Sequence, residues 1–205
     1  MTLVAVTKYA ELDWVRELVS LGQMDLGESR PQQLVSRAGQ LPDTVRWHMI
    51  GHLQRNKTES LAPVATLIHS VDSTRLFDYI AKLGTQYQTR PAILLEVNVS
   101  GEQTKDGFRP DELLAVWPRF AECDSVRVEG LMTMAPLDDS PDAARPVFRQ
   151  LREFRDELRS RTGGRITLNE LSMGMSGDFE VAIEEGATLV RIGSRLFEGL
   201  SSDQR

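Results

Sequence analysis

The chain has 205 residues, enough for one large hydrophobic core, and α/β barrels of this length fold as single domains. Its net charge of -6, with 24 basic residues spread along the chain, argues against non-specific binding to nucleic acid or to an anionic membrane. No uncharged segment reaches the roughly 20 residues that span a bilayer. A single cysteine, Cys123, cannot form an internal disulfide and suits a reducing cytoplasm. We therefore expect one cytoplasmic domain over residues 1–205, with a frayed tail at 201–205.

Short β-branched runs alternate with amphipathic stretches about every 25 residues, the length of one strand–helix unit. The pattern predicts eight strands, at residues 3–7, 25–29, 47–53, 66–72, 92–100, 126–134, 166–174 and 187–194. It predicts helices at 11–22, 73–84 and 142–164, with Asp72 or Ser73 capping the second and Pro146 near the first turn of the third. Eight strands, each followed by a helix or helical turn, favour an α/β fold that is a single (β/α)8 TIM barrel.

Lys8 directly follows the first predicted strand, an uncharged run that ends abruptly on Thr7. Active sites of such barrels lie at the carboxyl ends of the strands, where a partly desolvated amine has a lowered pKa. A lysine placed there can attack a carbonyl group, although a strand-end lysine can also simply extend into solvent. The position favours an imine-forming role for Lys8.

The last two predicted strands are each followed by a glycine-containing turn and a helix. The first of these turns lies at 173–178, and the second contains Gly193 and Ser194. Loops in these two places form the recurrent phosphate site of TIM barrels, because unpaired N–H groups and the helix dipole favour an anion. Either loop alone could be an ordinary turn, but two adjacent loops favour a phosphate.

An imine-forming lysine that faces a phosphate site indicates a ligand with both an aldehyde and a phosphate group. Pyridoxal 5′-phosphate (PLP) is the common ligand of this kind. Arg191, on the eighth predicted strand, lies close to this site in sequence, but it could also form a salt bridge with Glu180 or Glu184. His48 and His52 lie four residues apart in a strand without a suitable third ligand nearby, so we predict no metal site.

Seven segments together resemble the pyridoxal phosphate homeostasis protein family, which consists of single-domain PLP-binding barrels. The resemblance runs in order from residue 3 to about residue 199, and its last segment is very specific. The segments are AVTK (5–8), GES (27–29), WHMIGHLQRNK (47–57), HSVD (69–72), EVNVSGEQTKDGF (96–108), GLMTM (130–134) and LSMGMSGDFEVAIEEGATLVRIGSRLF (171–197).

The resemblance implies a role for each of several residues. Lys8 would hold PLP covalently as a Schiff base, and Arg191 would face the nitrogen of the pyridine ring. Ser172 and the amides near Gly193 and Ser194 would bind the phosphate. Because an arginine stays protonated, its contact would leave the ring nitrogen unprotonated and weaken the ring as an electron sink.

The resemblance also implies a function without an established catalytic turnover, and therefore no catalytic residues. Members of the family are cytosolic PLP binders that buffer or deliver the cofactor and keep amino-acid and vitamin B6 pools balanced. The expected partners are PLP and, as recipients, apo forms of PLP-dependent enzymes, with no nucleic acid or membrane partner. We expect a monomer.

The sequence departs from the family pattern at two places. Members usually carry a helix ahead of the first strand, whereas here Met1 nearly adjoins that strand, so the chain is shortened or the barrel bottom is open. The second strand commonly ends in Gly-Glu-Asn, but Ser29 stands where the asparagine is expected. A serine reaches less far than an asparagine amide, which weakens the expected contact from Ser29 to the phenolic oxygen of the cofactor.

Two enzyme functions remain as alternatives. An amino-acid racemase or decarboxylase of the alanine racemase type uses a similar barrel and lysine, but it adds a C-terminal β domain with a second base, which we do not find here. A barrel that acts on a phosphosugar through a lysine imine would need acid and base carboxylates on other strands. Glu28 and Glu96 could serve in that role.

Overall fold

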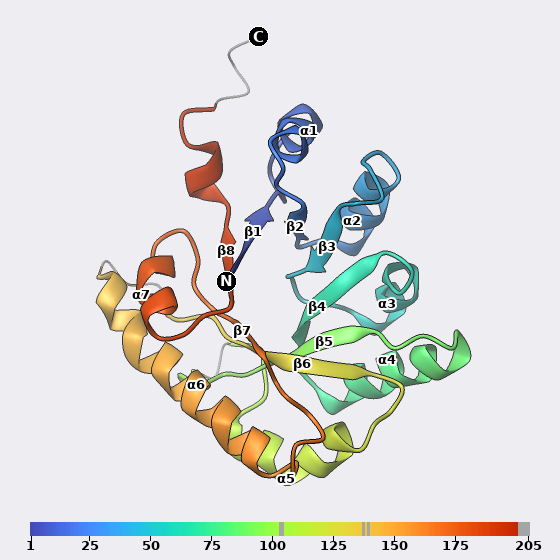
Figure 1. Cartoon of the computed structure of the whole chain (residues 1–205), viewed down its shortest axis with the longest axis vertical. Helices are drawn as coiled ribbons and strands as arrows, with labels where there is room; N and C mark the ends of the chain where they lie inside the picture. Colours follow the sequence, from blue (N-terminus) through green and yellow to red (C-terminus); the bar gives the residue numbers. More distant parts are fainter. Residues whose placement is uncertain (103–104, 137, 139, 201–205) are drawn as a thin grey trace.

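The computed structural model describes residues 1–102, 105–136, 138 and 140–200; the tail at 201–205, predicted to fray, lies outside this part. Eight strands close into one barrel in chain order, from β1 to β8. Each strand is parallel to its neighbours, and β8 pairs with β1 to close the ring. The helices lie outside the strands (Figure 1). The predicted (β/α)8 TIM barrel is therefore confirmed.

The strands are short, as in other barrels of this type. They are β1 (Thr2–Val6), β2 (Asp25–Glu28), β3 (Arg46–Met49), β4 (Ala65–Val71), β5 (Ala92–Glu96), β6 (Arg127–Met132), β7 (Glu170–Ser172) and β8 (Leu189–Ile192).

Seven α-helices and two 3-10 helices occur in the described residues. They are α1 (Leu12–Ser20), α2 (Pro31–Ala38), α3 (Arg55–Leu61), α4 (Thr74–Gln86), α5 (Pro110–Ala121), η1 (Pro141–Ala144), α6 (Arg145–Ser160), α7 (Phe179–Glu184) and η2 (Ser194–Phe197). Ser73 caps α4 by accepting a hydrogen bond from the Leu76 amide, and Pro146 lies in the first turn of α6, both as predicted.

Six of the predicted strands are longer than the observed ones, and the third, fifth and seventh show how they differ. The third was expected to reach residue 53 and the fifth residue 100, but β3 ends at Met49 and β5 at Glu96. After Glu96 the chain leaves the barrel, and Val97 forms an isolated bridge with Phe108. The seventh was expected from residue 166, but Leu168 has a left-handed backbone with φ 44°, which an extended strand does not allow.

Apolar side chains fill two separate spaces. The larger cluster lies between the strands and the helices and includes the aromatic contact of Phe77 with Phe120, whose ring centroids are 4.4 Å apart. A second cluster of six buried residues is separate from it: Val4, Leu67, Ala92, Leu94, Met132 and Leu189. Side chains alternate between the two faces of a strand, so this second cluster occupies the inside of the barrel.

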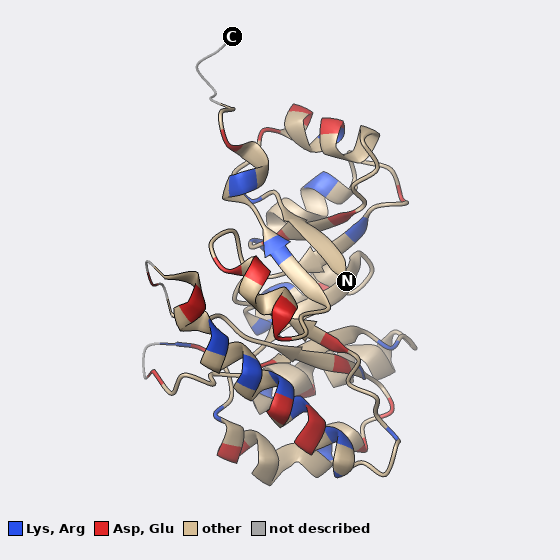
Figure 2. Cartoon of the chain, turned by 60° about the vertical axis from the view of Figure 1, so that its left-hand side comes forward, with Lys and Arg blue, Asp and Glu red and all other residues tan. Residues whose placement is uncertain are grey.

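Ion pairs join α6 to the end of α7. Acidic and basic residues follow one another along α6 (Figure 2). Three of its arginines converge on the buried Glu185, at 3.4 Å for Arg145, 3.0 Å for Arg149 and 3.1 Å for Arg152. These arginines lower the pKa of Glu185, against the opposing effect of burial. Among the described residues, no helix is both long enough and apolar enough to cross a membrane.

Candidate functional site

A cavity of about 720 Å³ opens at the carboxyl ends of the strands, where TIM barrels place their active sites. Its walls come from the loops after most of the strands, and part of its surface is formed by Val6, Ile50 and Phe197. The charged side chains that line it are those of Lys8, Glu96, Asp106, Asp138, Asp178 and Arg191. The cavity is large enough for a small cofactor.

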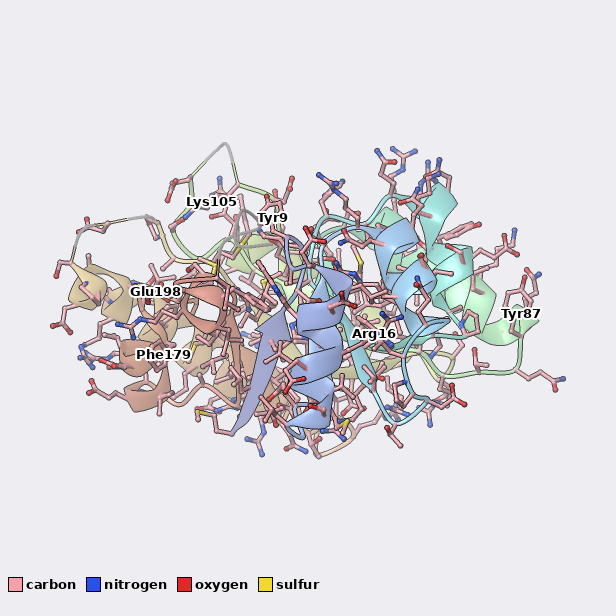
Figure 3. The ribbon with its side chains drawn as sticks, turned by 90° about the horizontal axis from the view of Figure 1, so that it is seen from above. Tyr9, Arg16, Tyr87, Lys105, Phe179 and Glu198 are labelled. Atoms are coloured by element: carbon pink, nitrogen blue, oxygen red, sulfur yellow. The ribbon has the colours of Figure 1, made fainter. Side chains whose placement is uncertain are left out.

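Lys8 lies in a turn, two residues beyond the end of β1. The side chain of Lys8 reaches the cavity. Its ammonium nitrogen is 5.0 Å from the centroid of the Tyr9 ring, within the range of a cation–π contact. Tyr9 is 81% exposed, and it lies on the same side of the molecule as Lys105 (Figure 3). The position of Lys8 at the cavity is the one that the sequence predicts.

Two loops after β7 and β8 bring backbone N–H groups to the cavity. Within the described part of the chain, the N–H groups of Ser176, Gly177 and Ser194 have no hydrogen-bond acceptor. The first loop turns at Gly174, where φ is +92° and an added Cβ would lie 2.5 Å from the Ala182 Cβ. The second loop is tied to the first, because the Gly193 amide donates to the Ser176 Oγ at 3.2 Å. Unpaired amides of this kind suit a phosphate group.

Arg191 is buried in the floor of the cavity. One guanidinium nitrogen donates to the Ser172 Oγ at 2.5 Å, and another donates to the Thr133 carbonyl at 3.1 Å. The salt bridge of Arg191 with Glu180 or Glu184, which the sequence left open, is not formed. Glu184 pairs instead with Arg145, and Glu180 approaches Arg195. Burial lowers the pKa of Arg191 to about 10, against the opposing effect of Glu96 and Asp178, so the group stays charged at neutral pH.

Ser172 lies beneath the cavity and does not line it. Its Oγ is 2.8 Å from the Nδ1 of His69, whose Nε2 is 2.9 Å from the Nδ1 of His48. The Nε2 of His48 is 3.1 Å from an Asp25 carboxylate oxygen, and that carboxylate accepts two hydrogen bonds from Arg46. Together with Arg191, these five residues form what we call the interior hydrogen-bond chain. It runs from the cavity to the opposite end of the barrel.

One arrangement of protons along the interior hydrogen-bond chain satisfies the partners at both of its ends. Because the Ser172 Oγ accepts from Arg191, its own hydrogen is free to point at His69 Nδ1. Neutral His69 then donates from Nε2 to His48, which donates from its own Nε2 to the Asp25 carboxylate. Every bond in this assignment has one donor and one acceptor.

The pKa values of the two buried groups agree with this assignment. Burial lowers the pKa of His69 well below its ordinary value, and the charge of Arg191 acts in the same direction, which keeps the ring neutral. Burial alone would raise the pKa of Asp25, but hydrogen bonds from His48 and Arg46 hold it well below its usual range. Asp25 is therefore a carboxylate acceptor at neutral pH.

Glu96 ends β5 and lines the cavity, and its carboxyl group has no hydrogen-bond partner among the described residues. Burial raises its pKa to about 7, and the charges of Asp72 and Asp106 contribute in the same direction, while Arg191 opposes them. Glu96 can therefore gain or lose a proton near neutral pH. It is one of the two carboxylates that the phosphosugar alternative requires; the other, Glu28, is buried and does not line the cavity.

One group in the described part of the chain has the atoms to hold a metal ion. His52 Nδ1 lies 3.1 Å from Asp72 and 3.4 Å from Asp106, and the three ligand atoms lie within 4.8 Å of one another. His48, considered together with His52 as a possible metal ligand in the sequence, lies inside the barrel. The two contacts of His52 Nδ1 are with carboxylate oxygens, and they are ion pairs only when the imidazole is protonated.

Ser29 follows β2 at the cavity wall, as the sequence predicts. Gly51, from the loop after β3, lies against it so closely that an added Cβ would be 2.4 Å from the Ser29 carbonyl oxygen. The small size of Gly51 therefore fixes the distance between the two loops.

The structure brings five of the six predicted binding residues to one cavity, namely Lys8, Ser29, Arg191, Gly193 and Ser194. The sixth, Ser172, is placed below it, with its hydroxyl engaged by Arg191 and His69. Its predicted contact with a phosphate is therefore not favoured by this geometry, and Ser176 lies better for that contact.

Sequence reasoning missed the interior hydrogen-bond chain and the proximity of Glu96 to Asp72 and Asp106. The alternation of side chains between the two faces of a strand could have indicated both features. His69 lies two residues after Leu67, and Glu96 two residues after Leu94, so both follow residues that face the inside of the barrel. Polar residues at inward positions must find partners, which predicts a network.

Comparison with known proteins agrees with the fold. The family model described as alanine racemase, N-terminal domain, matches residues 4–201. A pyridoxal phosphate homeostasis protein of Aquifex aeolicus is 43% identical over 95% of this chain and 85% of its own length. The corresponding protein of Deinococcus radiodurans is 41% identical over 95% of this chain and 88% of its own length.

A solved structure is also similar. PipY of Synechococcus elongatus, determined with PLP bound, superposes with a TM-score of 0.88 and is 33% identical. The match covers 96% of this chain and 92% of PipY. By the similarity of its sequence over nearly its whole length, this chain belongs to the pyridoxal phosphate homeostasis protein family.

Proposed function

We propose that this protein binds PLP in the cavity and takes part in intracellular PLP homeostasis. The observation that carries this proposal is the presence of three groups around one cavity: the Lys8 amine, the Arg191 guanidinium and the unpaired amides of the two loops. These groups suit an aldehyde, a pyridine nitrogen and a phosphate, respectively. The relatives named for PLP homeostasis and the PLP-bound PipY structure support the same conclusion.

Lys8 is the proposed site of covalent attachment. When bound, PLP supplies an aldehyde that forms a Schiff base with a primary amine. Lys8 is the lysine that lines the cavity among the described residues. Ser194, Gly193 and Ser176 would hold the phosphate, and Ser29 would reach the phenolic oxygen less well than an asparagine would.

Arg191 is the proposed partner of the pyridine nitrogen. Its guanidinium is held by Ser172 and Thr133 and stays charged, so it can only donate a hydrogen bond. A donor at that nitrogen keeps it unprotonated, and this limits the negative charge that the ring can accept. We therefore propose a carrier or regulator of PLP, without ordinary enzymatic turnover, that buffers the cofactor or delivers it to apo-enzymes.

A cytoplasmic monomer is the form that we propose. All the groups that suit PLP come from one chain, so the site needs no second copy. The single cysteine suits a reducing compartment.

Absorbance spectroscopy tests the proposal directly. The purified protein mixed with PLP should show a visible absorbance band that disappears on borohydride reduction, and peptide mass spectrometry should then find the adduct on Lys8. The Lys8→Ala variant should remain folded and lose the adduct. An adduct that persists in this variant, on Lys57 for example, would refute the assignment of Lys8.

Turnover of amino acids tests the carrier proposal. Incubated with L- and D-amino acids, the loaded protein should act barely faster than free PLP. Racemisation or decarboxylation at about 1 per second or faster would replace the carrier proposal with the enzyme alternative.

A further inference from the structure

The turn that carries Lys8 connects β1 to α1 and presents several carbonyl groups to α2. Its backbone is closed by a hydrogen bond from the Ala10 amide to the Thr7 carbonyl at 2.8 Å. Three carbonyls of this turn, those of Thr7, Lys8 and Ala10, accept hydrogen bonds from side chains of α2. The backbone on both sides of the Lys8 side chain is therefore held by one neighbouring helix.

Two residues of α2 supply these donors. Arg37 donates from one guanidinium nitrogen to the Thr7 carbonyl at 2.7 Å and from the other to the Ala10 carbonyl at 2.6 Å. Gln33, one helical turn earlier, donates to the Lys8 carbonyl at 3.2 Å. The planar, forked guanidinium can hold two carbonyls at a fixed separation, which the single ammonium of a lysine cannot do as well.

Glu28 fixes the position of Arg37. The two side chains form a buried ion pair of 2.5 Å, and the Thr7 hydroxyl donates to the same carboxylate oxygen at 2.6 Å. The other carboxylate oxygen of Glu28 has no partner among the described residues. A charge pair that is buried and only partly satisfied is a weak source of stability, so its presence next to the Lys8 turn calls for another explanation.

We propose that Arg37 and Gln33 are positioning residues for Lys8, and that Glu28 orients Arg37 for this task. This inference rests on the proposed function, because it explains how Lys8 is presented to an aldehyde. The lysine side chain is long and flexible, so its amine meets a carbonyl in a productive geometry more often when its backbone is fixed. Neither α2 residue lines the cavity, so both act through the turn.

The test compares covalent capture with non-covalent binding. PLP can react with Lys8, whereas pyridoxine 5′-phosphate has an alcohol in place of the aldehyde and cannot. The variants are Gln33→Leu and the double variant Glu28→Gln/Arg37→Met, which removes both charges and leaves no unpaired one. Gln32→Leu, at the exposed neighbouring position of the same helix, is the matched control.

Covalent capture should fall while non-covalent binding is kept. We expect the apparent affinity for PLP to fall about threefold to fivefold in Gln33→Leu and about tenfold or more in the double variant, as one and several lost hydrogen bonds imply. Affinity for pyridoxine 5′-phosphate should change less than twofold. In the protein without cofactor, acetylation of Lys8 by acetic anhydride, followed by peptide mass spectrometry, should change in rate in the same two variants and not in Gln32→Leu.

Two results would overturn the inference. One is capture of PLP by both variants at the wild-type level. The other is an equal loss of affinity for PLP and for pyridoxine 5′-phosphate, since α2 would then shape the whole cavity. If the double variant does not fold, the comparison of Gln33→Leu with Gln32→Leu decides the question alone. Failure of the proposed function is distinguishable, because the wild-type protein would then carry no adduct on Lys8.

Discussion

Replacing Ser172 by alanine tests whether the interior hydrogen-bond chain is continuous. The Ser172 hydroxyl accepts from Arg191 at 2.5 Å and lies 2.8 Å from His69 Nδ1, and all three residues are buried. The variant leaves two buried polar groups without this partner, each at a cost of about 1–3 kcal/mol. The expected loss is about 2–6 kcal/mol, out of the roughly 5–15 kcal/mol by which a domain is stable.

Thermal unfolding of the PLP-free protein, followed by circular dichroism, measures this loss. For a chain of this size 1 kcal/mol corresponds to about 2–4 °C, so Tm should fall by about 4–24 °C. Ser176→Ala is the control, because the half-buried Ser176 hydroxyl accepts one hydrogen bond, from the Gly193 amide. Loss of this single hydrogen bond should lower Tm by less than about 4 °C. A Tm for Ser172→Ala within about 2 °C of the wild type would refute the reasoning, since water or a rearranged Arg191 would then replace the hydroxyl.

Three further substitutions give distinct outcomes. Ser194→Asp should weaken binding of PLP far more than that of pyridoxal, because a carboxylate beside the loop amides repels a phosphate; equal losses in a titration would place the phosphate elsewhere. Glu96→Gln should leave the free energy of unfolding unchanged near pH 4 and raise it by about 3 kcal/mol above pH 7. Burial raises the pKa of the Glu96 carboxyl from 4.5 to about 7, so ionisation destabilises the folded wild-type protein as pH rises through that range. Denaturation of the variant with the same pH profile as the wild type would contradict this. Gly51→Ala should lower Tm, because the new Cβ would lie 2.4 Å from the Ser29 carbonyl oxygen. Gly39→Ala should not lower Tm, because the nearest atom to its new Cβ would be 3.8 Å away. Equal Tm values for the two variants would argue against close packing at Gly51.

The order of the strands was predictable because each one is a short apolar run followed by polar residues. The ends of the strands were less predictable. Glu96 continues the alternation of β5, and Val97 and Val99 after it alternate with polar residues, so nothing local shows that the chain leaves the barrel there. The end of a strand depends on its pairing with the next strand, which is a tertiary property.

The candidate site was predictable where a residue adjoins a strand end or a glycine turn, as Lys8 and Gly193 do. The family resemblance implies a contact of Ser172 with the phosphate, but the Ser172 side chain lies inside the barrel, where His69 and Arg191 engage it. The role of Arg37 had no sequence signal at all, because its contacts with the Lys8 turn depend on how α2 packs beside β1 and β2.

The interior hydrogen-bond chain links the two ends of the barrel. It ends at Arg46, whose side chain is about half exposed at the start of β3, far along the barrel from the cavity. Amino-acid changes at that end are usually regarded as changes in stability alone. In this protein Arg46 and Asp25 are joined through His48, His69 and Ser172 to Arg191, so a substitution at that end changes the partners of a hydrogen-bond chain that finishes at the cavity.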